Sequence, residues 1–356
     1  MSFPCARIDA EALRQNLAAV RGFAPLSRVM AVIKANAYGH GLVAAAKALH
    51  GADALGVARL GEGLALRSAD ITNTIVLLEG VFTADELRRA GQERFELVVH
   101  SFAQIDLLEQ YGGAHHFNVW LKVDTGMNRL GFRVDEFAAA YGRLSLCRSV
   151  AMLRLMTHLA SAEDLSGESA KAQIDRFNLL TQGLHLERSI ANSAGLIGWP
   201  QARLDWVRPG VMLYGISPIP GVDAAQLGLQ PVMTLTTQLI AVRHVPAGEC
   251  VGYGGIWQAP RDSLVGIAAI GYGDGYPRNM RAGTPILVNG LAARVVGRIS
   301  MDMTAVDVTG LDVGIGDAVT LWGKGLPAEQ VAPFADTIAY ELVCGISQRV
   351  RVEWEE

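Results

Sequence analysis

The chain has 356 residues, of which half are hydrophobic and 19% are charged, a composition that supports large buried cores and argues against intrinsic disorder. Its length suggests about two domains. The 35 acidic residues slightly outnumber the 31 lysines and arginines, and no dense basic cluster points to a nucleic-acid partner.

The first two-thirds of the chain alternates short apolar runs with helical patterns. Eight β-type runs separated by helices predict a (β/α)8 barrel, because such a barrel needs eight parallel strands in about 250 residues. An open, doubly wound sheet is the alternative, since periodicity does not reveal whether a sheet closes. The eight predicted strands cover residues 29–33, 54–58, 74–78, 97–99, 117–123, 152–157, 189–192 and 204–207.

Amphipathic segments lie between these runs. They predict helices over residues 83–90, 102–111, 136–144 and 169–184. Thr83 followed by Glu86 has the spacing of a capping box, and Ser101 stands where a helix cap is expected.

The pattern changes after about Gly228, where β-type runs follow one another with few helical segments. Asn289-Gly290 is a strong hairpin signal, and only residues 328–334 have a helical pattern. These features predict a mostly antiparallel β domain over 229–356 after a barrel domain over 1–228, with residues 1–9 as candidates to join the second domain. The predicted strands cover residues 232–245, 263–270, 284–288, 293–296, 304–308 and 318–322.

A lysine stands at the end of the first predicted strand. Lys34 follows five apolar residues and precedes a loop with Tyr38 and two glycines. An amine at the mouth of a buried strand is partly desolvated, which lowers its pKa and allows a Schiff base with a carbonyl compound such as pyridoxal phosphate. A solvated lysine at a strand end is the ordinary alternative.

Other polar residues follow later barrel strands. His158 follows the sixth, Ser193 the seventh and Arg208 the eighth. In a barrel these ends share one face, and a phosphate site commonly lies after strands seven and eight. Ser193 and the backbone N–H groups of Gly210 and Val211 are therefore candidates to bind phosphate. Taken singly, a satisfied histidine, a capping serine and a surface arginine explain them equally well.

The remaining features argue for a cytoplasmic protein. Residues 1–10 lack the apolar core of a secretory signal, and glycines and prolines interrupt the apolar stretch over 211–242, so no membrane span is predicted. The four cysteines are scattered, which is typical of reduced thiols. The eight histidines show no metal-ligand spacing, so no metal site is predicted.

Several segments in chain order resemble the bacterial, pyridoxal-phosphate-dependent alanine racemases. The resemblance spans both predicted domains and implies a barrel, a C-terminal β domain and a homodimer with composite active sites. The matching segments are Ala31-Val-Ile-Lys-Ala-Asn-Ala-Tyr-Gly-His-Gly41, Leu121-Lys-Val-Asp-Thr-Gly-Met-Asn-Arg-Leu-Gly131, Arg208-Pro-Gly-Val-Met-Leu-Tyr-Gly215, Val251-Gly-Tyr-Gly254, Gly271-Tyr-Gly-Asp-Gly-Tyr276, Gly297-Arg-Ile-Ser-Met-Asp-Met303 and Tyr340-Glu341.

The resemblance implies two catalytic residues. Lys34 would hold the cofactor as a Schiff base and act on one face of the substrate, while Tyr253 of the partner subunit would act on the other. Two acid/base groups on opposite faces are the simplest arrangement for racemisation. A tyrosine has a reference pKa of about 10, so Tyr253 would need nearby positive charge to ionise near neutral pH.

The resemblance also implies a cofactor-binding set. The phosphate ligands would be Tyr38, Ser193, Gly210, Val211 and Tyr340. Arg208 would contact the pyridine nitrogen, and His158 would link this arginine to the catalytic tyrosine. Because arginine offers only donors, the ring nitrogen would stay unprotonated and withdraw electrons weakly, which favours racemisation over transamination.

Further residues acquire implied roles towards the substrate. Arg129 and the backbone of Met301 would bind its carboxylate. Lys122 matches a lysine that is carbamylated in many family members, and Tyr272 and Asp302 match residues at the substrate entrance.

The expected function is thus the interconversion of L- and D-alanine by two bases. A racemase of broader specificity, a decarboxylase with a related barrel, and a non-catalytic carrier of pyridoxal phosphate are the alternatives. The second domain and Tyr253 argue against the carrier. A role in making D-alanine as a peptidoglycan precursor and a role in alanine breakdown both stay open.

Overall fold

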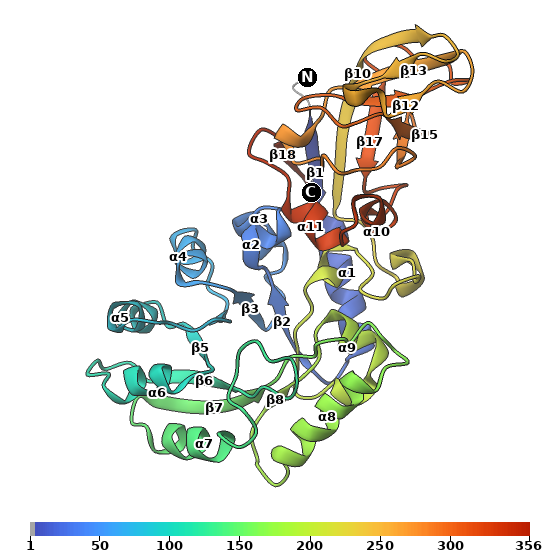
Figure 1. Ribbon diagram of the computed structural model, residues 1–356. Helices are drawn as coiled ribbons and strands as arrows, with labels where there is room; N and C mark the ends of the chain where they lie inside the picture. Colours follow the sequence, from blue (N-terminus) through green and yellow to red (C-terminus); the bar gives the residue numbers. More distant parts are fainter. Residues whose placement is uncertain (1–3) are drawn as a thin grey trace.

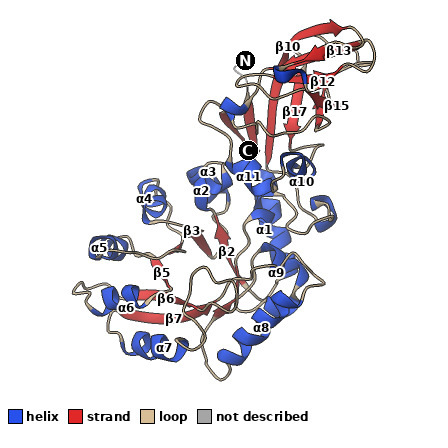
Figure 2. Ribbon diagram, viewed as in Figure 1, coloured by secondary structure: helices blue, strands red, loops and turns tan. Residues whose placement is uncertain are grey.

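The computed structural model describes residues 4–356, so residues 1–3 of the predicted N-terminal segment lie outside the described part. It contains a closed barrel of eight parallel strands with helices around it, and a separate, mostly antiparallel β sheet (Figures 1 and 2). The fold class predicted from the sequence is therefore confirmed.

The barrel strands pair in chain order, and the last strand pairs with the first. Each overlaps one of the predicted runs, and the closure rules out the open sheet. Five strands are shorter than predicted. In the strand predicted over 189–192, residues 190–192 leave the ladder to lead into a helix at the barrel mouth. The strands are β2 Arg28–Val32, β3 Ala54–Val57, β4 Ile75–Leu77, β5 Glu96–Val99, β6 Phe117–Lys122, β7 Val150–Met156, β8 Arg188–Ser189 and β9 Trp206–Val207.

The interior of the barrel is filled with side chains. Trp120 and Trp206 meet edge to face, with ring centroids 5.4 Å apart. The Arg154 guanidinium lies 5.2 Å from the Trp120 ring and pairs with the Glu96 carboxylate at 2.9 Å. Glu96 begins β5, so this packing lies towards the N-terminal ends of the strands. The barrel is thus a packed core, and its C-terminal end is left for a site.

The helices of this part pack outside the barrel (Figure 2). They are α1 Ala10–Phe23, α2 Lys34–Tyr38, α3 Leu42–Ala48, α4 Leu60–Ser68, α5 Ala84–Gln92, α6 Phe102–Glu109, α7 Phe137–Leu146, α8 Glu168–Leu180 and α9 Ser193–Gly198. The four predicted helices are confirmed as α5 to α8. The capping box is only half formed: Thr83 Oγ1 accepts from the Glu86 N–H, but the Glu86 carboxylate accepts from the Phe82 N–H. Ser101 precedes α6 without a side-chain cap bond.

The second sheet contains β1 Cys5–Asp9, β10 Met233–Val245, β13 Ser263–Ala268, β14 Pro285–Val288, β15 Leu291–Val296, β16 Thr304–Asp307, β17 Ala318–Trp322 and β18 Arg351–Glu355. The long strand β10 organises it by pairing with β1, β13 and β17. The order is β13-β16-β15-β14-β17-β10-β1-β18, and β13 also pairs with β10. Asn289 and Gly290 have φ values of 50° and 79° and join β14 to β15, which confirms the predicted hairpin. Two short strands, β11 Cys250–Val251 and β12 Trp257–Gln258, form a separate two-stranded sheet.

The prediction of a single helical segment in the C-terminal part was wrong. Residues 328–334 do form α10, Ala328–Val331, and a 3-10 turn, Ala332–Ala335, but a further helix α11 spans Ala339–Cys344. Six residues between Ile338 and Gly345 are too few to show a helical period. Strand β18 also escaped prediction, because its parallel partner β1 lies at the opposite end of the sequence.

The two parts of the molecule meet at α11, which lies beside α2 (Figure 1). A Cβ on Gly39 would come within 2.1 Å of the Val343 carbonyl oxygen, so the backbones touch there. β1 joins the second sheet before α1 leads back to the barrel. The division at residues 228 and 229 stays a prediction.

Within residues 4–356, none of the helices combines the length and the apolar character that crossing a membrane requires.

Candidate active site

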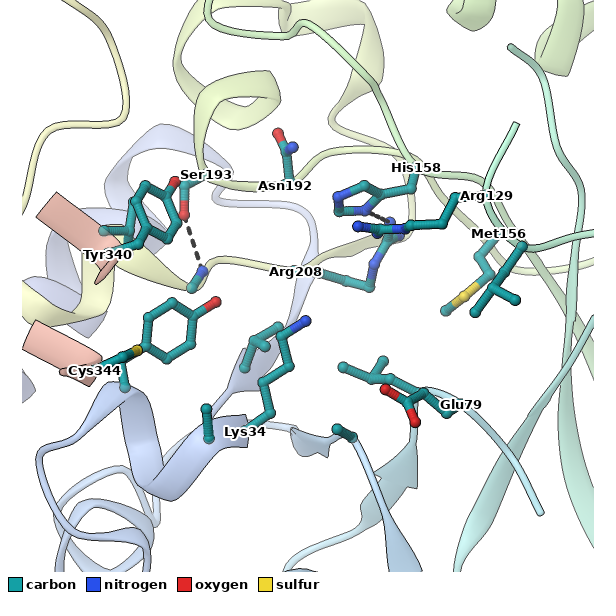
Figure 3. Close-up of a pocket in the computed structure, with 18 of the residues that line it drawn as sticks. Lys34, Glu79, Arg129, Met156, His158, Asn192, Ser193, Arg208, Tyr340 and Cys344 are labelled. Carbon is teal, nitrogen blue, oxygen red and sulfur yellow. Dashed lines mark hydrogen bonds between the residues drawn. The ribbon is translucent and has the colours of Figure 1, made fainter. Parts of the chain in front are cut away.

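A cavity of about 480 Å³ opens at the C-terminal end of the barrel and is bordered by α11. The loops after seven barrel strands contribute to it, which is the expected place for a site in this fold. Figure 3 shows most of its side chains pointing inwards. Among the described residues, its lining is Val32, Lys34, Ala35, Tyr38, Ala58, Leu78, Glu79, Lys122, Arg129, Leu130, Met156, His158, Asn192, Ser193, Arg208, Gly210, Val211, Tyr340 and Cys344.

Lys34 begins α2, and only Ile33 separates it from the end of β2. Its side chain is half-buried and reaches into the middle of the cavity (Figure 3). Burial and then the positive charge of Arg129 lower the pKa of Lys34, while Glu79 and Glu62 oppose this shift. A larger fraction of the amine is therefore neutral near pH 7 than in an exposed lysine, which makes it a better nucleophile and base.

One end of the cavity is lined by neutral hydrogen-bond donors. Ser193 Oγ accepts from the Gly210 N–H at 2.9 Å, and a Cβ on Gly210 would come within 2.4 Å of the Tyr38 hydroxyl. Burial and then the neighbouring Tyr340 raise the pKa of Tyr38, and burial and Glu163 raise the pKa of Tyr340 to about 12. Both phenols therefore keep their protons, and hydroxyl and N–H donors of this kind suit a phosphate group.

Arg208 lies deep in the cavity, where it is 6% exposed and surrounded by hydrogen-bond acceptors. It donates to Ser189 Oγ and the Thr157 carbonyl, both at 2.5 Å, and to His158 Nδ1 at 3.4 Å. Burial lowers the pKa of Arg208 to about 10, so the guanidinium stays charged at neutral pH. Burial and the Arg208 charge lower the pKa of His158 well below its usual value, so this imidazole is neutral and accepts from the arginine.

Lys122 and Arg129 add two cationic side chains to the lining of the cavity. Lys122 ends β6 and is 8% exposed, and Arg129 stands on the loop that follows this strand. Burial and then the charges of Arg129 and Arg208 lower the pKa of Lys122 to about 8, with Asp124 opposing. Four cationic side chains face a single carboxylate, that of Glu79, in this cavity, which favours an anionic ligand.

Ten of the residues singled out in the sequence line this cavity, and four do not. The four, Tyr253, Tyr272, Met301 and Asp302, belong to loops and short turns of the second β sheet. Tyr253 is 68% exposed and begins the turn Tyr253–Gly255, and Met301 is 52% exposed. Arg349 binds the Asp302 carboxylate at 2.7 Å, which ties this loop to the end of the chain. Within one chain, therefore, the structure does not join these residues to the cavity.

Sequence reasoning missed three polar or reactive residues of the lining. Glu79 stands two residues after β4, so the rule that identified Lys34 at a strand end would also have found it. Asn192 Oδ1 caps α9 by accepting from the Gly195 N–H at 2.8 Å, a role its place before Ser193 indicates. Cys344 lies four residues after Tyr340 on α11. It was not identified because α11 itself was not predicted.

No group of three or more His, Cys, Asp or Glu side chains with the geometry of a metal site occurs within residues 4–356.

Comparisons with known proteins match the whole chain. The family model for the alanine racemase N-terminal domain matches residues 8–218, and the model for the C-terminal domain matches residues 232–354. An alanine racemase of Aeromonas hydrophila is 49% identical over 99% of this chain and 100% of its own length, and one of Shewanella sediminis is 50% identical over 98% of both.

Solved structures agree with these relatives. The biosynthetic alanine racemase from Pseudomonas aeruginosa superposes with a TM-score of 0.97 at 42% identity and full coverage of both chains. The alanine racemase from Acinetobacter baumannii gives a TM-score of 0.95 at 38% identity, again with full coverage. The chain belongs to the alanine racemase family, whose racemases depend on pyridoxal phosphate.

Proposed function

We propose that this chain interconverts L- and D-alanine with pyridoxal phosphate bound at Lys34, and that it works as a homodimer in which the partner subunit supplies Tyr253. The observation that carries the proposal is the convergence, in one cavity, of a half-buried lysine amine, a charged arginine and a set of phosphate-binding donors. Full-length relatives named alanine racemase support the choice of substrate.

The donor set fits the phosphate of the cofactor. The hydroxyls of Tyr38, Ser193 and Tyr340 and the N–H groups of Gly210 and Val211 would hold it at the end of the cavity beside α9. The Lys34 amine would hold the carbonyl carbon. When bound, pyridoxal phosphate withdraws electrons from the amino acid joined to it and so acidifies the hydrogen on the α-carbon.

Arg208 would keep the pyridine nitrogen unprotonated. A guanidinium has donors only, and burial leaves the pKa of Arg208 at about 10, so it presents no acceptor at neutral pH. Its bonds to Ser189 and Thr157 hold it in place, and neutral His158 lies on its flank. A pyridine nitrogen that faces Arg208 would have to accept a hydrogen bond and so stay unprotonated. The cofactor ring would then withdraw electrons only as strongly as proton exchange at the α-carbon needs.

Lys34 would move the proton on one face of the substrate. Burial and Arg129 lower the pKa of its Nζ, so a larger fraction of the amine is in the neutral form that takes a proton than in an exposed lysine. The phenol of the partner's Tyr253 would exchange the proton on the opposite face. The exposure of Tyr253 in the single chain fits a side chain that enters the active site of a second subunit.

Arg129 and the backbone N–H of Met301 would bind the substrate carboxylate, with Tyr272 and Asp302 at the entrance. Lys122 would add carbon dioxide: its neutral amine attacks the carbon, a C–N bond forms, and a proton is released to give a carbamate anion. The pKa of Lys122, lowered to about 8, favours the neutral amine, and the charges of Arg129 and Arg208 would stabilise the anion.

The direct test is racemisation of purified protein. With L-alanine, the optical activity should decay to zero, and dialysis against a carbonyl scavenger followed by pyridoxal phosphate should remove and restore this activity. No turnover despite cofactor binding would leave the carrier alternative, and equal turnover of serine, lysine or arginine would indicate broader specificity. We also propose a cytoplasmic location and the domain division 1–228 and 229–356.

A further inference from the structure

The segment that follows Lys34 has a backbone conformation that side chains disfavour. Ala35, Asn36, Ala37 and Tyr38 all have φ between 53° and 54°, and the first three have ψ between 44° and 54°, so they form one turn of left-handed helix. None of the four is glycine, and L-residues visit this region as single residues rather than in runs. Contacts outside the turn must therefore hold it.

His40 makes two of these contacts. Its Nδ1 lies 3.0 Å from the carbonyl oxygens of both Ala37 and Tyr38, which are the last two residues of the turn. Both partners are acceptors, so Nδ1 must carry the hydrogen and donate to them. The imidazole is fully buried, and burial lowers its pKa to about 4, so it is neutral near pH 7.

The second ring nitrogen of His40, Nε2, indicates that the histidine contributes through Nδ1. Within the described residues, His40 Nε2 is buried and has no hydrogen-bond partner. A buried acceptor without a partner destabilises the fold, and an apolar side chain of similar size would avoid that penalty. The donor at Nδ1 is thus the distinctive contribution of a histidine at this place.

The ring also reaches the donor-lined end of the cavity through an aromatic stack. The His40 centroid lies 4.5 Å from that of Tyr214, which lies 4.7 Å from that of Tyr38. The Tyr214 hydroxyl donates to the Val32 carbonyl at 3.1 Å, just before Lys34. His40 and Tyr214 together contact both ends of the segment that carries the Lys34 amine and the Tyr38 hydroxyl.

We propose that His40 is a positioning residue that holds the left-handed turn closed, so that pyridoxal phosphate meets a preorganised Lys34 and Tyr38. The proposal rests on the proposed function as far as the cofactor is concerned. A turn that opens part of the time leaves only a fraction of molecules competent to bind, and the apparent dissociation constant rises by the inverse of that fraction.

The test compares two variants of similar shape. His40→Asn keeps a donor near the position of Nδ1, whereas His40→Leu has none, and both lose the ring equally. We expect His40→Leu to bind pyridoxal phosphate about ten to a hundred times more weakly than His40→Asn in a fluorescence titration of the cofactor-free proteins. Hydrogen exchange of peptides covering residues 35–41 in the same cofactor-free proteins should be faster in His40→Leu by a similar factor.

His50→Leu is the matched control, because this exposed histidine also contacts a carbonyl, that of Lys47, through Nδ1 at 3.2 Å. It should bind the cofactor like the wild type. Equal dissociation constants and equal exchange in the two His40 variants would overturn the proposal, and so would failure of both to fold, since His40 would then support the whole barrel. If the wild type itself does not bind pyridoxal phosphate, the proposed function fails, while the exchange comparison still decides the role of His40.

Discussion

The turn at Lys34 and the turn at Tyr253 carry the two proposed acid/base groups, yet they are built in opposite ways. The first contains four consecutive non-glycine residues with positive φ, and side chains of its own chain hold it. In the second, Gly252, Gly254 and Gly255 take the positive φ values, and Tyr253 is 68% exposed. One turn is held against its own preference, and the other follows the preference of glycine.

This difference separates two ways of placing a catalytic group. The Lys34 turn is complete within one chain, because the Glu62 carboxylate accepts from the Ala35 N–H at 2.7 Å and His40 donates to the other end. The Tyr253 turn has no place in the cavity of its own chain. We therefore expect damage at the first turn to affect every property of the site, and damage at the second to affect catalysis alone.

The largest expected effect is that of Lys34→Ala. It removes both the amine that would hold the cofactor and the base on one face, so racemisation should fall by about 10⁴-fold or more in both directions. The measurement is the initial rate from L-alanine and from D-alanine, with the absorbance of bound cofactor recorded alongside. Lys47→Ala, at an exposed lysine on α3, is the control and should be active. Retained racemisation by Lys34→Ala would contradict the assignment.

Tyr253→Phe should be nearly as inactive but should keep its cofactor. The loss of one acid/base group predicts a decrease of roughly 10²–10⁴-fold in racemisation, with unchanged affinity for pyridoxal phosphate. Mixing this variant with Lys34→Ala and reassociating the chains should restore about a quarter of the wild-type rate, because half of the dimers then contain one intact composite site of two. No recovery in the mixture would show that the two residues do not meet across subunits.

Acid should destabilise the Lys34 turn through His40. Burial lowers the pKa of His40 to about 4, so between this value and the unfolded value of about 6.5 the unfolded chain binds the extra proton and stability falls as the pH falls. Tyr38 and Tyr214, which face the ring, stay protonated throughout because burial raises the pKa of each.

Urea unfolding at pH 7 and pH 4.5 measures this loss. The wild type should lose on the order of 2 kcal/mol more than His40→Asn between the two values. The pKa of His158 and that of His100 are also lowered by burial, and both residues are present in either protein, so the difference between the proteins isolates His40. Identical losses would contradict the neutral imidazole.

The smallest expected effects are of opposite sign. Ala35→Gly removes the cost of placing a side chain in the left-handed region, about 1–2 kcal/mol. Glycine loses more backbone entropy on folding, which costs about 0.5–1 kcal/mol, so the variant should be more stable by roughly 0.5–1 kcal/mol. Gly254→Ala meets no atom closer than 3.8 Å, so it should destabilise by about 1 kcal/mol through conformation alone. Chemical denaturation measures the free energy of unfolding of both variants. A change in the same direction for the two would contradict the proposed difference between the turns.

The barrel and the cavity-forming residues on its strand ends were predictable from sequence because their signals are local. Lys34, His158 and Arg208 each follow an apolar run of strand length, and parallel strands bring such ends together. The resemblance to a known family then supplied roles that spacing alone did not.

The rest depends on contacts between distant parts of the chain. Helix α11, with Tyr340 and Cys344, is short and takes its place from packing against α2, so no local pattern indicated it. The left-handed turn contradicts the preference of alanine for right-handed helix, and contacts with more distant groups, among them Glu62, His40 and the Val343 carbonyl, stabilise it. Tertiary contacts override local propensity at these two places.

The pairing of β1 with β18 has a consequence for how the protein is made. Cys5–Asp9 leaves the ribosome first among the strands and lies beside Arg351–Glu355, which leaves it last. The barrel strands all precede residue 208, so the barrel can close while the second sheet is still being synthesised. β1 meanwhile gains β10 on one edge, and its other edge stays open until β18 has been synthesised.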